Sequence, residues 1–103
     1  QQLSEPIRQA LSSILNRRRA IRSLEGQIRQ QEARIKNITD DQARIRENMR
    51  ALDRNSDLYR QYVQKLTQQE REIEQARAEI ERLQEQRARA QRELSDYIAG
   101  LNL

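Results

Sequence analysis

The sequence predicts an all-α fold, a long antiparallel coiled-coil hairpin of two helices that turns near Asn55. Three observations predict it. Apolar residues recur at alternating steps of three and four along two segments, the two segments mirror each other, and a cluster of turn-forming residues separates them. A three-four alternation that is held over many turns is typical of a coiled coil.

The composition agrees with helices and argues against a globular core. Charged residues make up 35% of the 103 residues, and the chain has no Trp, Phe, Cys or His. Such a composition fits either disorder or a long helix. The seven-residue repeat favours the helix, because a disordered segment has no reason to keep one.

The first helix is expected over about residues 5–52. Ser4 can cap its start, Glu5 suits the positive end of the helix dipole, and Pro6 fits the first turn. A second capping pattern occurs inside this helix at residues 39–42. We expect the helix to continue through it, since the heptad phase does not skip; a local distortion is the alternative.

The turn is expected at residues 53–57, the densest cluster of turn-forming residues, and the second helix over about residues 58–99. Asn55 or Ser56 can cap this helix, and Gly100 suits a left-handed residue at its end. The turn and the two helices form one domain over residues 1–103. The chain starts with Gln1 and not with Met, and we expect it to be a fragment of a larger protein.

The register of the hairpin follows from folding the chain at Asn55. Residues of the repeat on one helix then meet residues of the repeat on the other whose numbers total 111, for example Ile38 and Ile73. These facing residues form the seam. Its rows on the first helix are Leu3, Ala10, Arg17, Leu24, Gln31, Ile38, Ile45 and Leu52, with Ile7, Ile14, Ile21, Ile28, Ile35, Gln42 and Met49. Its rows on the second helix are Tyr59, Leu66, Ile73, Ile80, Arg87, Leu94 and Leu101, with Tyr62, Gln69, Ala76, Leu83, Ala90 and Tyr97. Gln42 meets Gln69 in the one layer that has glutamine on both sides. Where arginine occupies the seam, as at Arg17 opposite Leu94, we expect the side chain to extend outward over the facing leucine.

Apolar residues outside the seam gather at the end where both termini emerge. They are Leu11, Leu15, Ile98 and Leu103. Scattered exposed leucines are ordinary, but a cluster predicts docking onto the rest of a parent protein, with pairing between two copies as the competing interpretation. At the tip, Leu58 lies off the seam, whereas Tyr59 and Tyr62 are expected in it, with an outward partner-binding platform as the alternative.

The strongest basic cluster lies near the same end. In the hairpin, arginines of both helices converge there into a basic collar. The basic collar consists of Arg17, Arg18, Arg19, Arg22, Arg87, Arg89 and Arg92. It is the basis of an alternative function, a nucleic-acid- or phosphate-binding arm. The net charge of only +4 and the lack of an aromatic platform disfavour nucleic acid. No membrane insertion is expected, because the seam uses the apolar stripe and no apolar run is long enough to span a bilayer.

Nothing in the sequence points to an enzyme. The carboxylates lie on helix faces beside basic neighbours, and a two-helix hairpin offers no pocket that would shift their pKa values for catalysis. Without His and Cys the chain lacks the ligands of transition-metal sites and the residues of catalytic triads. We expect no catalytic residue, no cofactor and no metal.

The residues around the tip carry a family resemblance. The stretch 41–49, followed by residues 53–66 and by Gln69 and Glu70, resembles the C-terminal helical hairpin of bacterial mucoidy-inhibitor-like proteins, a family of unknown function. The opening stretch 3–11 is similar to the entry of that region. The resemblance implies a bacterial source, association with the cell envelope and a β domain outside this sequence. It transfers no catalytic residues.

The sequence therefore predicts a structural and protein-interaction module. The hairpin would act as a spacer or as a partner-presenting arm of a larger bacterial protein. The expected partners are a parent β domain, another protein or a second copy of the chain.

Overall fold

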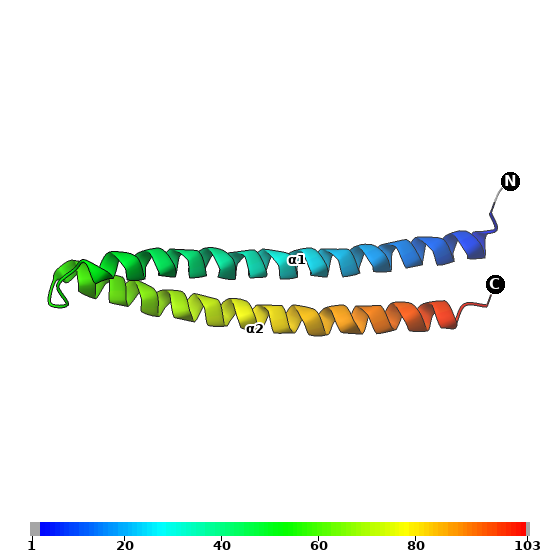
Figure 1. The fold of residues 1–103 in the computed structure, drawn as a ribbon. Helices are drawn as coiled ribbons and strands as arrows, with labels where there is room; N and C mark the ends of the chain where they lie inside the picture. Colours follow the sequence, from blue (N-terminus) through cyan, green and yellow to red (C-terminus); the bar gives the residue numbers. More distant parts are fainter. Residues whose placement is uncertain (1–2, 103) are drawn as a thin grey trace. The chain divides into compact units, whose positions relative to one another are not determined.

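In the computed structural model, which describes residues 3–102, the chain forms two α-helices. α1 runs from Glu5 to Arg50 and α2 from Asp57 to Ala99, and the two pack antiparallel (Figure 1). The all-α, two-helix hairpin is thus confirmed. Its packing falls into two compact units. The tip unit contains residues 29–80, and the base unit contains residues 3–28 and 81–102.

Ser4 caps α1 as its sequence position predicts. Its hydroxyl accepts a hydrogen bond from the Ile7 amide at 3.4 Å, and its carbonyl accepts one from the Arg8 amide at 3.0 Å. The first amides of a helix have no partner inside the helix, so a serine at this position supplies the missing acceptor.

α1 continues without a break through residues 39–42. The Thr39 hydroxyl donates to the Ile35 carbonyl at 2.8 Å, one turn back, and Asp40 accepts from Lys36 at 2.9 Å. These side chains therefore bond within a running helix and do not cap a new one. The alternative of a local distortion at this point is wrong.

The connection between the helices is slightly longer than expected. α1 ends at Arg50, two residues before the predicted end at residue 52. The amides of Ala51 and Leu52 bond to carbonyls three residues back, at 3.4 and 3.1 Å. This tightening of the last turn satisfies end carbonyls that the α-helical pattern leaves unpaired.

Ser56 is the residue that caps α2. Its hydroxyl accepts from the Tyr59 amide at 3.2 Å, and its carbonyl accepts from the Arg60 amide at 3.3 Å. The backbone amide of Asn55 instead donates a hydrogen bond to the Asp53 carboxylate at 2.9 Å, inside the turn. α2 consequently begins at Asp57, one residue earlier than predicted.

The expectation of a left-handed glycine at the end of α2 is wrong. Gly100 does not have a positive φ angle. Its amide bonds to the Asp96 carbonyl at 3.0 Å, and the Leu101 amide bonds to the Ile98 carbonyl at 3.2 Å. α2 ends by tightening its last turn, which needs no left-handed residue.

The buried apolar residues all belong to the predicted seam rows. In the tip unit they are Ile45, Ile73 and Ala76, and in the base unit they are Ala10, Ile21, Ile28 and Leu83. In the tip unit, hydrogen bonds between the helices join Gln42 to Glu70 and Gln69 to Asp41. The summed residue numbers of each pair differ from the predicted total of 111 by only one. The register that the sequence predicts is therefore the register of the tip unit.

The topology makes a prediction about crosslinking. Cysteines in place of Ile38 and Ile73 are expected to be joined within one chain by a short bis-maleimide, because these seam residues oppose each other in the hairpin. Gel electrophoresis under denaturing conditions separates the products. Crosslinked species that are only dimeric would show that the helices pair between two chains.

Candidate interaction surface

A polar layer crosses the seam of the tip unit at Gln42 and Gln69, which are 3% and 6% exposed. Gln42 donates to Glu70 at 2.9 Å, and Gln69 donates to Asp41 at 2.6 Å. Each glutamine thus bonds to a carboxylate beside the other glutamine. Because both bonds join α1 to α2, shifting one helix along the other would break both at once. The layer therefore favours one register of the tip unit.

Asp41 is the centre of this layer. Its carboxylate accepts two bonds from the Arg44 guanidinium, at 2.8 and 2.9 Å, and lies 3.7 Å from the Lys65 ammonium. The hydrogen bond from Arg44, followed by that from Gln69, lowers the pKa of the Asp41 carboxyl below its usual value. Asp41 was not among the sequence-predicted sites. Its position next to a seam glutamine was the available signal.

The lowered pKa predicts a contribution to acid stability. A carboxyl whose pKa is lower in the folded state stabilises the fold above its unfolded value near 4, and this contribution disappears as the pH falls through the folded pKa. Asp41→Asn should therefore lower the melting temperature at pH 7 and lower it less at about pH 2. The control is Asp40→Asn, an exposed neighbour that bonds to Lys36 within α1. Equal shifts at both pH values would contradict this role.

The tip residues divide between the seam and the surface. Tyr59 and Tyr62 are half-buried, and the Tyr62 hydroxyl accepts a hydrogen bond from the Asn48 amide group at 3.3 Å. Tyr59 lines a surface hollow together with Met49, Leu52 and Leu66. Leu58 is 46% exposed. The rings therefore lie against seam residues, which favours the packing interpretation over an outward platform.

Truncation of Tyr59 tests this arrangement. Tyr59→Ala should lower the free energy of unfolding by about 2 kcal/mol, at the low end for a large side chain because the ring is half-buried. Leu58→Ala, an exposed neighbour, should change it by less than about 0.5 kcal/mol. Urea unfolding followed by circular dichroism gives both values. An unchanged stability for Tyr59→Ala would show that the ring projects outward.

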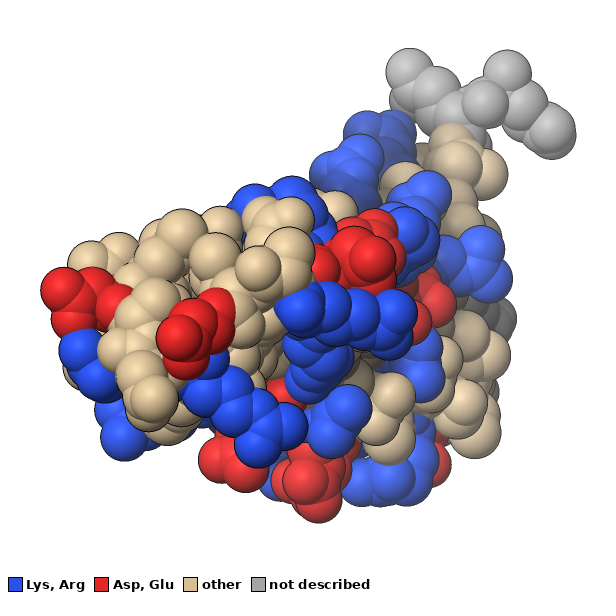
Figure 2. Space-filling model, turned by 60° about the vertical axis from the view of Figure 1, so that its left-hand side comes forward, with Lys and Arg blue, Asp and Glu red and all other residues tan. Residues whose placement is uncertain are grey.

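The basic collar lies entirely in the base unit. Arg17 and Arg87 are half-buried, and the other five arginines are exposed. Among the described residues, no ion pair involves any of the seven. Figure 2 shows one side of the molecule, on which blue basic and red acidic side chains lie among uncharged residues. The charges of the five exposed collar arginines are available to a ligand or partner.

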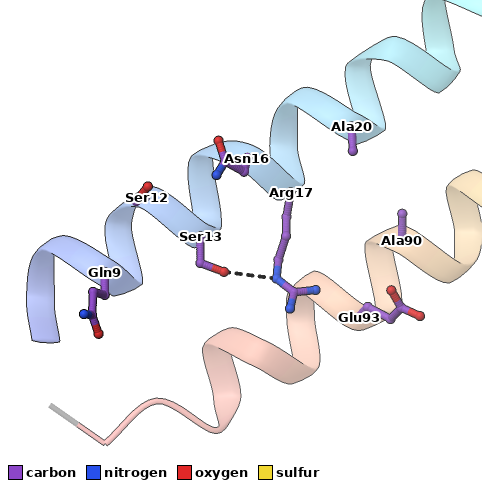
Figure 3. Close-up of a pocket in the computed structure, with 8 residues that line it drawn as sticks. All are labelled: Gln9, Ser12, Ser13, Asn16, Arg17, Ala20, Ala90 and Glu93. Carbon is purple, nitrogen blue, oxygen red and sulfur yellow. Dashed lines mark hydrogen bonds between the residues drawn. The ribbon is translucent and has the colours of Figure 1, made fainter.

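Arg17 turns toward α2 (Figure 3). Its Nε donates to the Ser13 hydroxyl at 3.3 Å, and its guanidinium carbon lies 4.8 Å from the centre of the Tyr97 ring. The head group of Arg17 thus has Tyr97 as its partner, and packing of its stem over Leu94 stays a prediction. An aromatic face attracts a cation more strongly than a leucine does. Small neighbours, Ala20 and Ala90, leave a surface hollow beside it.

The apolar residues predicted at the base are exposed. Leu11, Leu15 and Ile98 are 46%, 49% and 43% exposed, while Leu103 lies outside the described residues. Leu3 joins them, because it precedes the start of α1 and is 50% exposed although it continues a seam row. Leu3, Leu11 and Leu15 line one surface hollow, together with four polar residues. These are Arg8, Ser12, Asn16 and Arg19.

Within residues 3–102, no group of three or more acidic residues is placed to hold a metal ion. Over the same residues, neither helix has a stretch apolar enough to cross a membrane.

Comparison of the chain with protein-family models, with curated proteins and with solved structures finds no match.

Proposed function

We propose that this chain is a structural and protein-interaction module, a coiled-coil hairpin that serves as a spacer or partner-presenting arm of a larger bacterial protein. One observation supports the proposal above others. The base unit buries four seam residues, Ala10, Ile21, Ile28 and Leu83, and leaves Leu11, Leu15 and Ile98 exposed by more than two fifths. Monomeric proteins rarely expose several large apolar residues together unless a partner covers them.

Burial of these exposed apolar side chains would release enough free energy for docking. Covering apolar surface contributes about 25 cal/mol per Å², so a few such side chains contribute several kcal/mol before the entropic cost of association. The family resemblance suggests a β domain of the same protein as one occupant. A second copy of the chain is another. Both would use the base unit and would leave the tip unit free.

Sedimentation of the chain tests whether this surface binds. Leu11→Glu with Leu15→Glu should dissociate any dimer that is joined through the base unit, because each change places a charge in the apolar contact. Leu58→Glu with Val63→Glu is the matched control, since these residues are exposed to the same degree in the tip unit. A dimer that resists the first pair and dissociates with the second would place the interface at the tip and contradict the proposal.

A second candidate function is phosphate or nucleic-acid binding by the basic collar. The absence of ion pairs at its arginines, among the described residues, favours it. The logarithm of an oligonucleotide affinity should then fall linearly with the logarithm of salt concentration. Arg18→Gln with Arg22→Gln should reduce that slope by about two, because each arginine would neutralise one phosphate. An unchanged slope would exclude these two arginines as phosphate ligands.

A further inference from the structure

One flank of the base unit combines the exposed leucines with the arginines in a regular pattern. Along α1, Arg8, Leu15 and Arg22 follow one another at steps of seven, and Leu11 and Arg18 do so in the neighbouring row. All five are exposed. Two surface hollows share Leu15 in their lining. One is lined by Leu11 and Leu15, and the other by Leu15, Arg18 and Arg22. Leucine and arginine thus alternate along one strip of the helix.

α2 contributes to the same flank. Leu11 directly follows the buried seam residue Ala10, and Ile98 directly follows the seam residue Tyr97. Two antiparallel helices are related by a two-fold axis perpendicular to them. Ala10 and Tyr97 occupy equivalent seam positions, so the residues that directly follow them, Leu11 and Ile98, lie on the same side of the helix pair. The Leu–Arg flank is therefore a surface of both helices. It consists of Arg8, Leu11, Leu15, Arg18, Arg22 and Ile98.

The charge of the strip on α1 has one sign. Between Glu5 and Glu25 the sequence has five arginines and no acidic residue. The structure records no ion pair, among the described residues, for any of the flank's arginines. A partner that covers the leucines must come within a few ångströms of these charges. Complementarity then requires acidic groups beside its apolar residues.

We infer that the Leu–Arg flank receives an acidic amphipathic helix, whose apolar stripe covers the leucines and whose carboxylates pair with the arginines. The inference rests on the proposed function as an interaction module and names the chemistry of the partner. The flank is formed by the adjacent faces of two helices. Such a surface suits a third helix, which would pack along the pair as in a helix bundle. On α2, a hollow lined by the small residues Ala88 and Ser95, together with Gln91, Arg92 and Asp96, leaves room for it.

The same features disfavour other occupants. A second copy related by a two-fold axis would bring the same basic strip against itself, placing arginine near arginine. Nucleic acid would cover the leucines without an aromatic residue on the flank to stack its bases. A membrane-surface helix separates its apolar and charged residues onto opposite faces, whereas here leucine and arginine alternate on one strip.

Two synthetic helical peptides of about three heptads test the inference. Both have leucine at the a and d positions, and their flanking positions are all glutamate in one and all glutamine in the other. Fluorescence anisotropy measures their binding to the 103-residue chain. The acidic peptide should bind about tenfold more tightly at low salt, since several exposed charge pairs add up to such a factor. The difference should vanish at about 1 M salt.

Paired variants separate the two parts of the surface. Leu11→Asn with Leu15→Asn should weaken both peptides, whereas Arg18→Glu with Arg22→Glu should weaken only the acidic one. Arg46→Glu with Arg50→Glu, at the same spacing on exposed positions of the tip unit, should change neither. Circular dichroism establishes that each variant remains helical.

The other possible results would each contradict one element of the inference. Equal binding of the two peptides would refute the acidic partner and leave the interaction module standing. Tighter, leucine-dependent binding to phosphatidylglycerol vesicles would replace the acidic helix by a membrane surface. A dimer that Leu11→Asn with Leu15→Asn dissociates, without peptide binding, would make the second copy the occupant. If peptides and vesicles do not bind and the chain is monomeric, the inference of an acidic helical partner fails, whereas the proposed docking of the base unit onto a β domain does not.

Discussion

Replacing Ile45 with alanine is expected to lower the free energy of unfolding by about 3 kcal/mol. Ile45 is completely buried in the seam of the tip unit. The change removes the transfer free energy of the deleted carbons and leaves a cavity that two helices can only partly close. Because a two-helix hairpin has a small core, this loss should be a large part of its total stability.

Urea unfolding at several chain concentrations measures the effect. Val63→Ala is the control, since Val63 is 43% exposed in the same unit and should cost less than about 0.5 kcal/mol. Similar losses for the two variants would show that Ile45 does not lie in a packed core. A loss that grows smaller with increasing concentration would indicate that association contributes to the measured stability.

Replacing both Gln42 and Gln69 with leucine is expected to raise the free energy of unfolding by about 2 kcal/mol. The Oε1 atom of Gln69 is buried without a hydrogen-bond partner, and both side chains occupy apolar seam positions. Leucine removes the unpaired polar atom and adds apolar surface to the seam. The carboxylates that lose their amide donors, Asp41 and Glu70, can still bond to water, because neither is buried.

The gain in stability should be accompanied by a loss of register. With the two hydrogen bonds of the glutamine layer gone, the middle of the tip unit is held mainly by apolar contacts, which tolerate a shift of one heptad more readily. Thermal unfolding measures the first effect, and crosslinking of cysteines at Ile38 and Ile73 measures the second as a lower yield. Gln30→Leu with Gln64→Leu, at exposed positions of the tip unit, should leave both unchanged. A lower melting temperature for the seam variant would mean that the glutamines stabilise the tip unit outright.

The candidate surface was predicted in part. Leu11, Leu15 and Ile98 could be identified from the sequence because they fall outside the heptad rows, and residues outside the rows have no partner in the seam. Leu3 could not, because it continues a row but lies before the helix begins. The role of Arg8 in the flank was missed, since a single arginine on a helix surface is ordinary until its leucine neighbours are known to be exposed.

The sequence by itself determined the fold class, the helix cap at Ser4 and the layer of Gln42 and Gln69. The fold class and the position of the layer follow from the period of the repeat along both helices, and the cap follows from a side chain that bonds within one turn. Only the tertiary structure decided that Arg17 stacks on Tyr97 and that Asp41 completes the polar layer. Long polar side chains can reach several partners from one helix position. The choice among them depends on which side chains of the other helix lie within hydrogen-bonding or stacking distance.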